Sequence, residues 1–322
     1  MLRKLVLFYF FLSGCLMLQA QKPFIICSYI RGNFYNSGRI SDESLLACND
    51  LIYISIHPQR DGSLVLEKPR VASGDKKQEW ESVVKSVQAK LNNRRDIHFR
   101  LGVASGEWIP MSADSIARTT FVKNIKELID RFGLDGVDID FEGGTKQKEY
   151  DHLSLILVEL RETLGGESII STSLHPVGYQ ISKAAIDAVN FITFQCYGPR
   201  PIHFPIEQFI VDVKMALDYG FPKEKLVPGV PFYGVSKDGS RKTMAYHSFV
   251  KDGLIVNPRT NEVTSNGIVY LFDGQDNIRK KTRYVLDMQL GGIMSWDLAT
   301  DVSFDNPTSL LRAMIEEVNT KK

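Results

Sequence analysis

The chain is poor in cysteine and carries no excess of either charge. It has 4 cysteines among 322 residues and a net charge of +1. Beyond the N-terminal region only Cys27, Cys48 and Cys196 remain, each in or beside an apolar run, so we interpret them as buried apolar side chains and not as a disulfide framework. The near-neutral charge gives no electrostatic argument for binding nucleic acid or an anionic membrane surface, and neither partner is expected.

Metal-ligand spacings are also missing. The sequence contains no Cys-x-x-Cys and no His-x-x-x-His pair. A cysteine and histidine metal cluster is therefore not expected, and we predict neither a metal centre nor a bound cofactor.

The first residues have the pattern of an export signal. Arg3 and Lys4 precede an apolar run at residues 5–12, as in secretory signals. This run is shorter than the ~20 residues that a bilayer span needs, and no later segment is long and apolar enough. The sequence therefore predicts an exported protein, secreted or periplasmic, without an integral membrane span.

Two processing sites compete in this region. Leu-Gln-Ala at residues 18–20 resembles a signal peptidase site, which would make residues 1–20 the signal. Leu-Ser-Gly-Cys at residues 12–15 resembles the lipoprotein box, which would remove residues 1–14 and leave a lipid on Cys15. The residues after Cys15 are apolar, whereas a lipoprotein tether is usually polar, so we favour soluble export and keep the lipid anchor as the alternative.

Apolar strand-like runs alternate with amphipathic helical stretches over the rest of the chain. Strands are predicted at residues 24–27, 51–56, 97–103, 134–142, 168–174, 189–196, 225–230 and 291–296. Helices are predicted at residues 41–48, 76–91, 116–132, 151–164, 207–219, 278–288 and 307–318. Between the last two strands, the polar region 236–269 has hairpin signals at Asp238-Gly239 and Asp252-Gly253.

This alternation implies a parallel sheet. Eight repeats over about 300 residues fit a single-domain (β/α)8 TIM barrel, which would occupy residues 21–322 and carry its active site at the C-terminal ends of the strands. A doubly wound sheet is the alternative, but it gives no reason for acidic side chains inside a buried parallel strand. We expect a monomer.

The fourth predicted strand carries the most informative pattern. In residues 134–142 the side chains Val137, Ile139 and Phe141 share one face, and Gly136, Asp138, Asp140 and Glu142 share the other. Crowded carboxylates repel one another, and this raises the pKa of one of them, as general acid catalysis requires. Two other interpretations remain open from spacing alone: an ordinary solvated strand face and a site for a hard cation.

The same strand resembles glycoside hydrolase family 18, the chitinases and endo-β-N-acetylglucosaminidases. The family motif Asp-Gly-x-Asp-x-Asp-x-Glu is complete here at residues 135–142. Residues 189–197, 228–234 and 291–297 resemble the sixth, seventh and eighth strands of the family, so the likeness covers nearly the whole exported chain. The region between the last two strands is too short for the large insertion domain that deepens the groove of many processive chitinases, so a shallow, open cleft is expected.

The resemblance implies a retaining hydrolysis assisted by the substrate, which uses no protein nucleophile. Glu142 would protonate the glycosidic oxygen and later activate water. Asp140 would orient the acetamide group of the sugar, and Asp138 would share a proton with Asp140. Tyr197 would donate to the acetamide oxygen; the alternative is an ordinary aromatic residue at a strand end.

The resemblance also suggests residues that bind the sugar. Trp296 would form the floor under the sugar ring, because aromatic faces suit sugar rings; core packing is the alternative. Further candidates are Gln195, Tyr29, Tyr233, Asp297 and Trp108. For Tyr29 a core position is equally well supported, and Trp108 could simply cover the rim of the barrel. His175 is ranked as an ordinary loop histidine.

Two departures from the family pattern affect these roles. Ala104 stands where many members have a serine that supports the inner aspartate, so the support of Asp138 is an open question. Gln195 replaces a methionine in a form that both chitinases and endo-β-N-acetylglucosaminidases use.

Three hypotheses therefore remain. Endo-hydrolysis of β-1,4-linked N-acetylglucosamine in chitin or chito-oligosaccharides is favoured, because residues 270–301 look more chitinase-like. Cleavage of the chitobiose core of N-glycans is the second. A sugar-binding protein without activity is the third, and the presence of Glu142 argues against it. In each case the partner is an oligo- or polysaccharide that contains N-acetylglucosamine.

Overall fold

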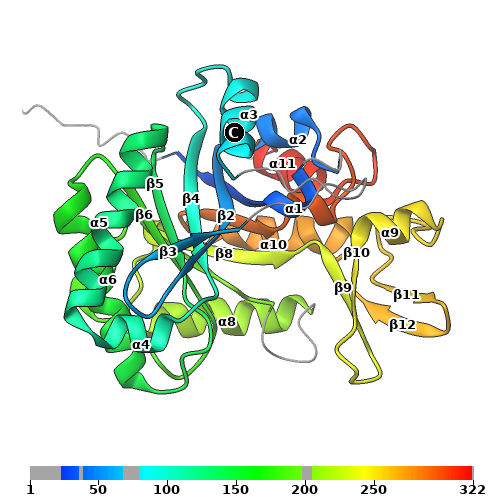
Figure 1. Cartoon of the computed structure of the whole chain (residues 1–322). Coiled ribbons are helices and arrows are strands. Elements are labelled where there is room, and N and C mark those ends of the chain that lie inside the picture. Colours follow the sequence, from blue (N-terminus) through cyan, green and yellow to red (C-terminus); the bar gives the residue numbers. More distant parts are fainter. Residues whose placement is uncertain (1–22, 36–38, 68–79, 198–204, 321–322) are drawn as a thin grey trace, which may run out of the picture.

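A computed structural model describes residues 23–35, 39–67, 80–197 and 205–320. Eight parallel strands form its centre (Figure 1). They are β1 (Ile25–Arg31), β2 (Asp50–Pro58), β4 (His98–Ala104), β5 (Gly136–Asp140), β6 (Ile169–Leu174), β7 (Phe191–Phe194), β8 (Leu226–Pro231) and β13 (Gly292–Trp296). Each lies within or close to a predicted strand, although β5 ends two residues before the predicted end at Glu142.

The strands close into a barrel. Their order is β1-β13-β8-β7-β6-β5-β4-β2, and β1 pairs with β2 as well as with β13. A ninth strand, β3 (Leu64–Leu66), adds to β2 in the antiparallel direction. The predicted TIM barrel is thus confirmed, and closure excludes the doubly wound sheet, which has open edges.

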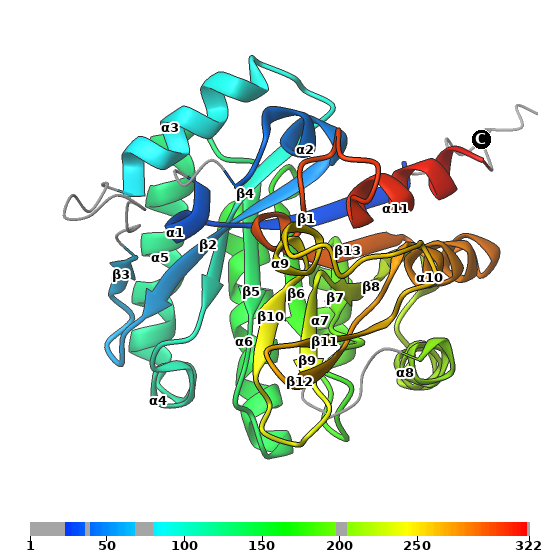
Figure 2. The ribbon, with the colours of Figure 1, turned by 90° about the vertical axis from the view of Figure 1, so that its right-hand side faces the viewer.

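Helices surround the barrel (Figures 1 and 2). They are α1 (Gly32–Tyr35), α2 (Asp42–Ala47), α3 (Trp80–Leu91), α4 (Trp108–Ala113), α5 (Ser115–Phe132), α6 (Gln147–Leu164), α7 (Lys183–Ala188), α8 (Ile206–Asp218), α9 (Tyr246–Lys251), α10 (Gln275–Asp287) and α11 (Leu310–Asn319). The short helices α1, α4, α7 and α9 were not predicted, because four to six residues are too few to show a helical period.

Local sequence explains the ends of the longer helices. The Asp114 side chain accepts from the backbone N–H groups of Ile116 and Ala117 at the start of α5, and Gly133 ends this helix in the left-handed conformation with φ 61°. At the start of α6, Glu149 accepts from the N–H groups of Thr145 and Lys146 at 2.6 and 3.0 Å. This cap places the start of α6 four residues before the predicted one.

The two faces of β5 have the predicted roles. Val137 and Ile139 are fully buried in the apolar layer between strands and helices, and Asp138 and Asp140 face the barrel interior. Gly136 begins the strand with φ +153°, and a Cβ atom there would lie 1.9 Å from the carbonyl oxygen of Ile169. Glycine at this position is what lets β5 start so close to β6.

A small second sheet lies between β8 and β13. Its order is β10-β9-β12-β11, and its strands are β9 (Tyr233–Ser236), β10 (Thr243–Ala245), β11 (Glu262–Ser265) and β12 (Ile268–Leu271). In Figure 1 it lies with α9 on the side of the barrel opposite α5 and α6. There is no large insertion domain in this region.

One of the two predicted hairpins is wrong. Asp238-Gly239 does lie in the turn between β9 and β10. Asp252-Gly253, however, ends helix α9, and Gly253 has φ +67°. The second hairpin turns instead at Asn266-Gly267, where both residues have positive φ, as the favoured tight hairpin turns require.

The predicted export signal, both processing sites and Cys15 lie outside the described residues, as do residues 76–79 at the start of one predicted helix. Within the described part of the chain, none of the helices is long and apolar enough to cross a membrane. Cys27, Cys48 and Cys196 are buried thiols that are not joined in disulfides, as predicted.

Candidate active site

Three carboxyl groups from β5 and the residues after it lie at increasing exposure. Asp138 is fully buried, Asp140 is 3% exposed, and the Glu142 side chain is 51% exposed at the mouth of the barrel. Alternate residues of a strand point to the same side, so the three groups form one row along the barrel axis. The row thus leads from the closed interior to solvent.

Asp138 is held by two hydroxyl groups. The Tyr29 hydroxyl donates to its Oδ2 at 3.0 Å, and the Ser171 hydroxyl donates to its Oδ1. Asp138 is therefore supported by side chains of β1 and β6. These take the place of the serine that many family members have at the position of Ala104. The sequence held a signal for this: Ser171 and Ser173 alternate along β6, in register with Asp138 and Asp140.

A buried ion pair forms the floor beneath Asp138. Arg100 and Asp50 are 2.6 Å apart at their closest atoms, and Arg100 also donates to Ser171 Oγ at 2.7 Å. Burial raises the pKa of Asp138, and the charge of Arg100 is the largest influence that opposes this rise. Sequence reasoning missed Arg100 and Asp50.

Asp140 lies between two other acids and is the site's strongest proton holder. Burial raises its pKa well above the usual value, and the charges of Glu142 and Asp138 raise it further. Gln195 donates to its Oδ1 at 2.9 Å and to Ser173 Oγ at 3.0 Å. Gln195 thus fixes the orientation of the Asp140 carboxyl group.

The raised pKa that crowding predicts for one of the carboxylates belongs to Asp140 in the free protein, and not to the proposed acid Glu142. The pKa of Glu142 is lowered, mainly through His175, whose Nε2 lies 3.6 Å from Glu142 Oε1. Repulsion raises the pKa of Asp140 because this buried group lies between the other two acids. His175, ranked as an ordinary loop histidine, directly follows β6 at the mouth of the barrel, a position that could have identified it.

Tyr197 and Tyr233 lie beside this row. Their rings meet edge to face, with centroids 6.4 Å apart. Burial raises the pKa of Tyr197, and it raises that of Tyr233 to about 12, so both hydroxyls stay neutral donors. Gly229 makes room for Tyr197, since a Cβ atom there would lie 2.8 Å from its ring.

Trp296 ends β13 as a half-buried ring. Tyr29 packs against it with centroids 5.1 Å apart, and the guanidinium of Arg31 lies 5.8 Å from its centroid. Arg31 in turn contacts Asp297 at 2.6 Å. The ring is therefore fixed from below and from one edge, while part of it remains accessible, as a sugar platform requires.

Three predicted sugar-binding residues lie below the surface. Tyr29 and Trp108 are 1% and 2% exposed, and Asp297 is fully buried. Trp108 packs between Phe121 and Phe141. This packing agrees with the alternative in which Trp108 only covers the rim of the barrel. We assign these three side chains to support of the site, and Trp296, Gln195 and Tyr233 remain candidates for contact with a ligand.

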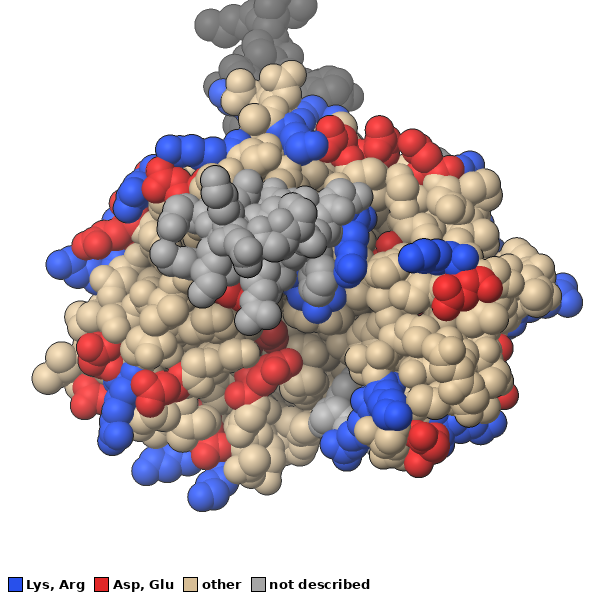
Figure 3. Space-filling model, turned by 45° about the vertical axis from the view of Figure 1, so that its right-hand side comes forward, with Lys and Arg blue, Asp and Glu red and all other residues tan. Residues whose placement is uncertain are grey.

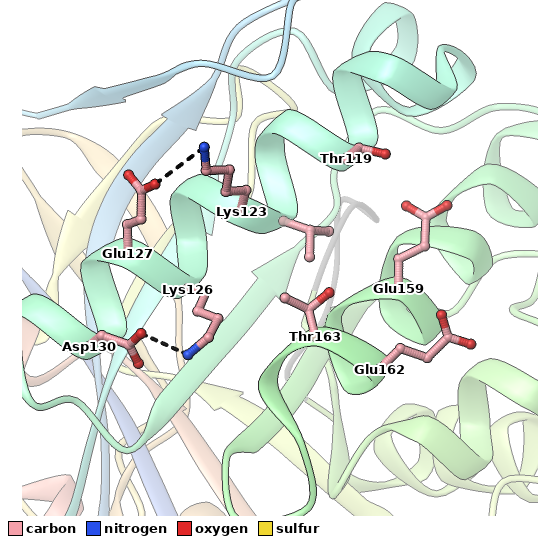
Figure 4. A pocket seen from close by; sticks show the side chains of 9 residues that line it. Thr119, Lys123, Lys126, Glu127, Asp130, Glu159, Glu162 and Thr163 are labelled. Atoms are coloured by element: carbon pink, nitrogen blue, oxygen red, sulfur yellow. Dashed lines mark hydrogen bonds and ion pairs between the residues drawn. The ribbon is translucent and has the colours of Figure 1, made fainter.

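No cluster of three histidine, cysteine, aspartate or glutamate side chains in the described ranges is arranged to hold a metal ion. A groove of about 460 Å³ lies away from the site, between α5 and α6 (Figure 4). The charged side chains that α5 contributes to it pair within that helix, Lys123 with Glu127 and Lys126 with Asp130. On the face in Figure 3, side chains of both signs are interspersed, as the near-neutral composition predicts.

Comparison with known sequences gives a consistent result. The sequence model of Glycosyl hydrolases family 18 matches residues 25–301. Probable chitinase 2 of Drosophila melanogaster is 23% identical over 278 residues, which cover 63% of this chain and 56% of that protein. Chitinase A1 of Niallia circulans is 22% identical, with 75% and 47% covered. The chain thus spans about half the length of these two relatives.

Solved structures have the same fold. The chitinase ChiB from the chitin utilization locus of Flavobacterium johnsoniae has a TM-score of 0.75 at 23% identity, covering 94% of this chain and 96% of that chain. A chitinase from Bacteroides thetaiotaomicron has a TM-score of 0.77 at 18% identity, covering 91% and 96%. Human YKL-39, described as a pseudo-chitinase with retained chitooligosaccharide binding, has a TM-score of 0.74 at 14% identity, covering 92% and 100%.

Proposed function

Because the chain belongs to glycosyl hydrolase family 18, we propose that it is a retaining endo-hydrolase of β-1,4-linked N-acetylglucosamine in chitin or chito-oligosaccharides. The observation that carries this proposal is the complete carboxylate row, in which Asp140, with a raised pKa, lies between the buried Asp138 and the accessible Glu142. A binding protein has no need to keep such a costly arrangement of acids.

Glu142 is the proposed general acid and base. In the free protein it is ionised, and the proton nearest to it along the row is on Asp140. A sugar bound over Glu142 would remove water from its carboxylate and raise its pKa. A proton passed from Asp140 would then make Glu142 the acid that protonates the leaving glycosidic oxygen.

The nucleophile belongs to the substrate. The carbonyl oxygen of the N-acetyl group attacks C1 as the glycosidic bond breaks, and this forms an oxazolinium ion with its positive charge close to Asp140. Asp140, now ionised, accepts from the acetamide nitrogen, and Tyr197 donates to the acetamide oxygen. Glu142 then removes a proton from the water that opens the ring. These fixed charges and donors stabilise the transition state without reorganisation.

The second candidate is a sugar-binding protein without activity. The similarity of the fold to that of YKL-39 is the reason to retain this candidate. The accessible Glu142 argues against it. Cleavage of the chitobiose core of N-glycans is a further outcome to be tested, since Gln195 suits both enzyme groups.

Two substrates assayed side by side test the proposal. We expect release of the chromophore from a chromogenic chitobiose glycoside and no release of glycan from a high-mannose glycoprotein. The reverse result would assign the N-glycan activity. Hydrolysis of neither substrate, with chito-oligosaccharide binding retained in calorimetry, would assign the binding protein.

We also propose that the protein is exported and monomeric. Export is supported by Arg3 and Lys4 before the apolar run at residues 5–12. Mass spectrometry of the mature N-terminus distinguishes Gln21 as the first residue from a lipid-modified Cys15, and sedimentation gives the oligomeric state.

A further inference from the structure

His175 is the titratable side chain in closest contact with Glu142. It follows β6 directly, and its Nε2 lies 3.6 Å from Glu142 Oε1. The imidazole is 17% exposed, whereas the carboxyl group is 51% exposed. A mostly buried imidazole therefore faces one oxygen of a more exposed carboxyl group.

The second ring nitrogen of His175 indicates which nitrogen carries the hydrogen. Nδ1 is buried and has no hydrogen-bond partner among the described residues. Unpaired buried N–H groups are rarer in proteins than buried acceptors that lack a donor. The tautomer that fits has its hydrogen on Nε2, which then points toward Glu142 Oε1.

The other groups around Glu142 act differently. Asp140 on β5 repels the Glu142 carboxylate, and the neutral hydroxyls of Tyr197 and Tyr233 lie near it. Gln195, after β7, stabilises the carboxylate to a smaller extent than His175. Among the described residues, the imidazole of His175 is thus the main group that favours a charged Glu142.

We infer that His175 is a positioning residue that turns Glu142 toward the end of β6 and keeps it ionised until substrate is bound. This inference rests on the proposed function. The balance of protons is simple: Asp140 holds one proton in the free protein, passes it to Glu142 when sugar covers both, and the glycosidic oxygen receives it as the C1–O bond breaks. His175 loses and gains no proton in this sequence.

This arrangement has a use for the reaction. After Glu142 has given its proton to the leaving oxygen, it must act as a base toward water, and a neighbour that stabilises the carboxylate favours that second state. With His175 beside it, the carboxylate is the resting form and also the form needed for the attack of water. Binding of substrate then converts the Glu142 carboxylate to the protonated form, which is the acid in the reaction.

The first test measures Glu142 without any substrate. In protein labelled with ¹³C at the glutamate carboxyl carbons, the Glu142 signal is the one lost in Glu142→Gln. We expect His175→Leu to raise the pKa of Glu142 and His175→Gln, whose amide can still donate, to remain close to wild type. His98→Leu, an exposed histidine at the opposite end of the barrel, is the matched control and leaves the titration unchanged.

A wild-type titration of Glu142 in His175→Leu overturns the inference, and so does an equal shift in the His98→Leu control. Because the measurement needs no turnover, its result does not depend on whether the protein hydrolyses chitin. A raised pKa in a protein without hydrolytic activity would remove the proposed function and leave the effect of His175 on Glu142 intact.

The second test uses the chromogenic chitobiose glycoside. In His175→Leu we expect the acid limb of kcat/KM, which reports Glu142 of the free protein, to move to higher pH. We also expect kcat to fall roughly tenfold and KM to stay within about twofold, since positioning of the acid is lost. His175→Gln restores most of kcat. An unchanged limb and kcat in an active His175→Leu variant overturn the inference.

Discussion

Arg100 and Asp138 are joined through one atom, the hydroxyl oxygen of Ser171, which accepts from Arg100 at 2.7 Å and donates to Asp138. Arg100 is fully buried and paired with Asp50. A buried charge is tolerated only where an opposite charge and hydrogen bonds compensate its lost hydration. The polar floor of the barrel therefore determines both the position and the charge of the innermost acid.

Ser171→Ala removes both of these hydrogen bonds. We expect the free energy of unfolding in urea to fall by about 1–3 kcal/mol, because Arg100 and Asp138 lose a buried partner. We expect kcat to fall as well, since Asp138 loses the donor that favours its ionised form. Thr172→Val is the matched control: it removes one bond of 2.8 Å to the Ile139 carbonyl on the other face of β6, so kcat is retained. Equal kcat values in the two variants would contradict the role of Ser171.

Glu142→Gln should lower kcat by several orders of magnitude, because the amide cannot protonate the leaving oxygen. The side chain is accessible and nearly the same size, so the fold and the affinity for chito-oligosaccharides should be unchanged. Steady-state kinetics and calorimetry measure the two effects. A variant with a near wild-type rate would remove Glu142 as the acid.

The first product should be the β-anomer. Attack by the acetamide oxygen inverts C1 once and attack by water inverts it again, so configuration is retained. Proton NMR in the first minutes of hydrolysis, before mutarotation, measures the anomer. An α-anomer would exclude assistance by the substrate.

Two buried aspartates predict how stability depends on pH. Burial raises the pKa of Asp297 and of Asp301 to about 6, whereas an unfolded aspartate titrates near about 3.9. Between these values the folded protein binds more protons than the unfolded chain, so these groups make stability fall as pH rises from about 4 to about 6. Urea unfolding at pH values from 4 to 7 measures this fall in stability. It should be smaller in Asp297→Asn than in the wild type.

Asp238→Asn is the control for this experiment. Asp238 is exposed, and its bond with Ser240 lowers its pKa to about 2, so in the folded protein it stays ionised over the range tested. The wild-type slope should remain in this variant. The same slope in Asp297→Asn would show that Asp297 does not titrate as its burial predicts.

Gly136→Ala should lose several kcal/mol of stability or fail to fold. The new Cβ atom would meet the Ile169 carbonyl oxygen at 1.9 Å, in a strand that two neighbours hold in place. Gly166→Ala, where nothing lies within 4 Å of the added atom, is the control and should stay within about 0.5 kcal/mol of wild type. Thermal unfolding of the two variants provides the comparison.

Local patterns predicted the strands, the longer helices and the inward face of β5, because each depends on residues close in sequence. The partners of the acids depend on register across the barrel and were missed. Arg100 meets Asp50 only because β4 pairs with β2, and no local pattern reports that pairing. The charge of Glu142 could not be predicted either, since it is governed by His175 from another strand. Asp252-Gly253 was misassigned because a positive φ suits a helix end as well as a hairpin.

Asp138 and Asp140 of the carboxylate row lie on a single strand, fixed by β4 on one side and β6 on the other, and Glu142 follows that strand directly. Spacing along a strand is set by covalent geometry, so these acids keep their separations whatever happens at the rim. Loops above them can therefore lengthen, shorten or be exchanged without moving Asp138 and Asp140, provided that His175 at the start of the loop after β6 is kept. Evolution or protein engineering can alter the length and type of glycan accepted by rebuilding only what surrounds an unchanged reaction centre.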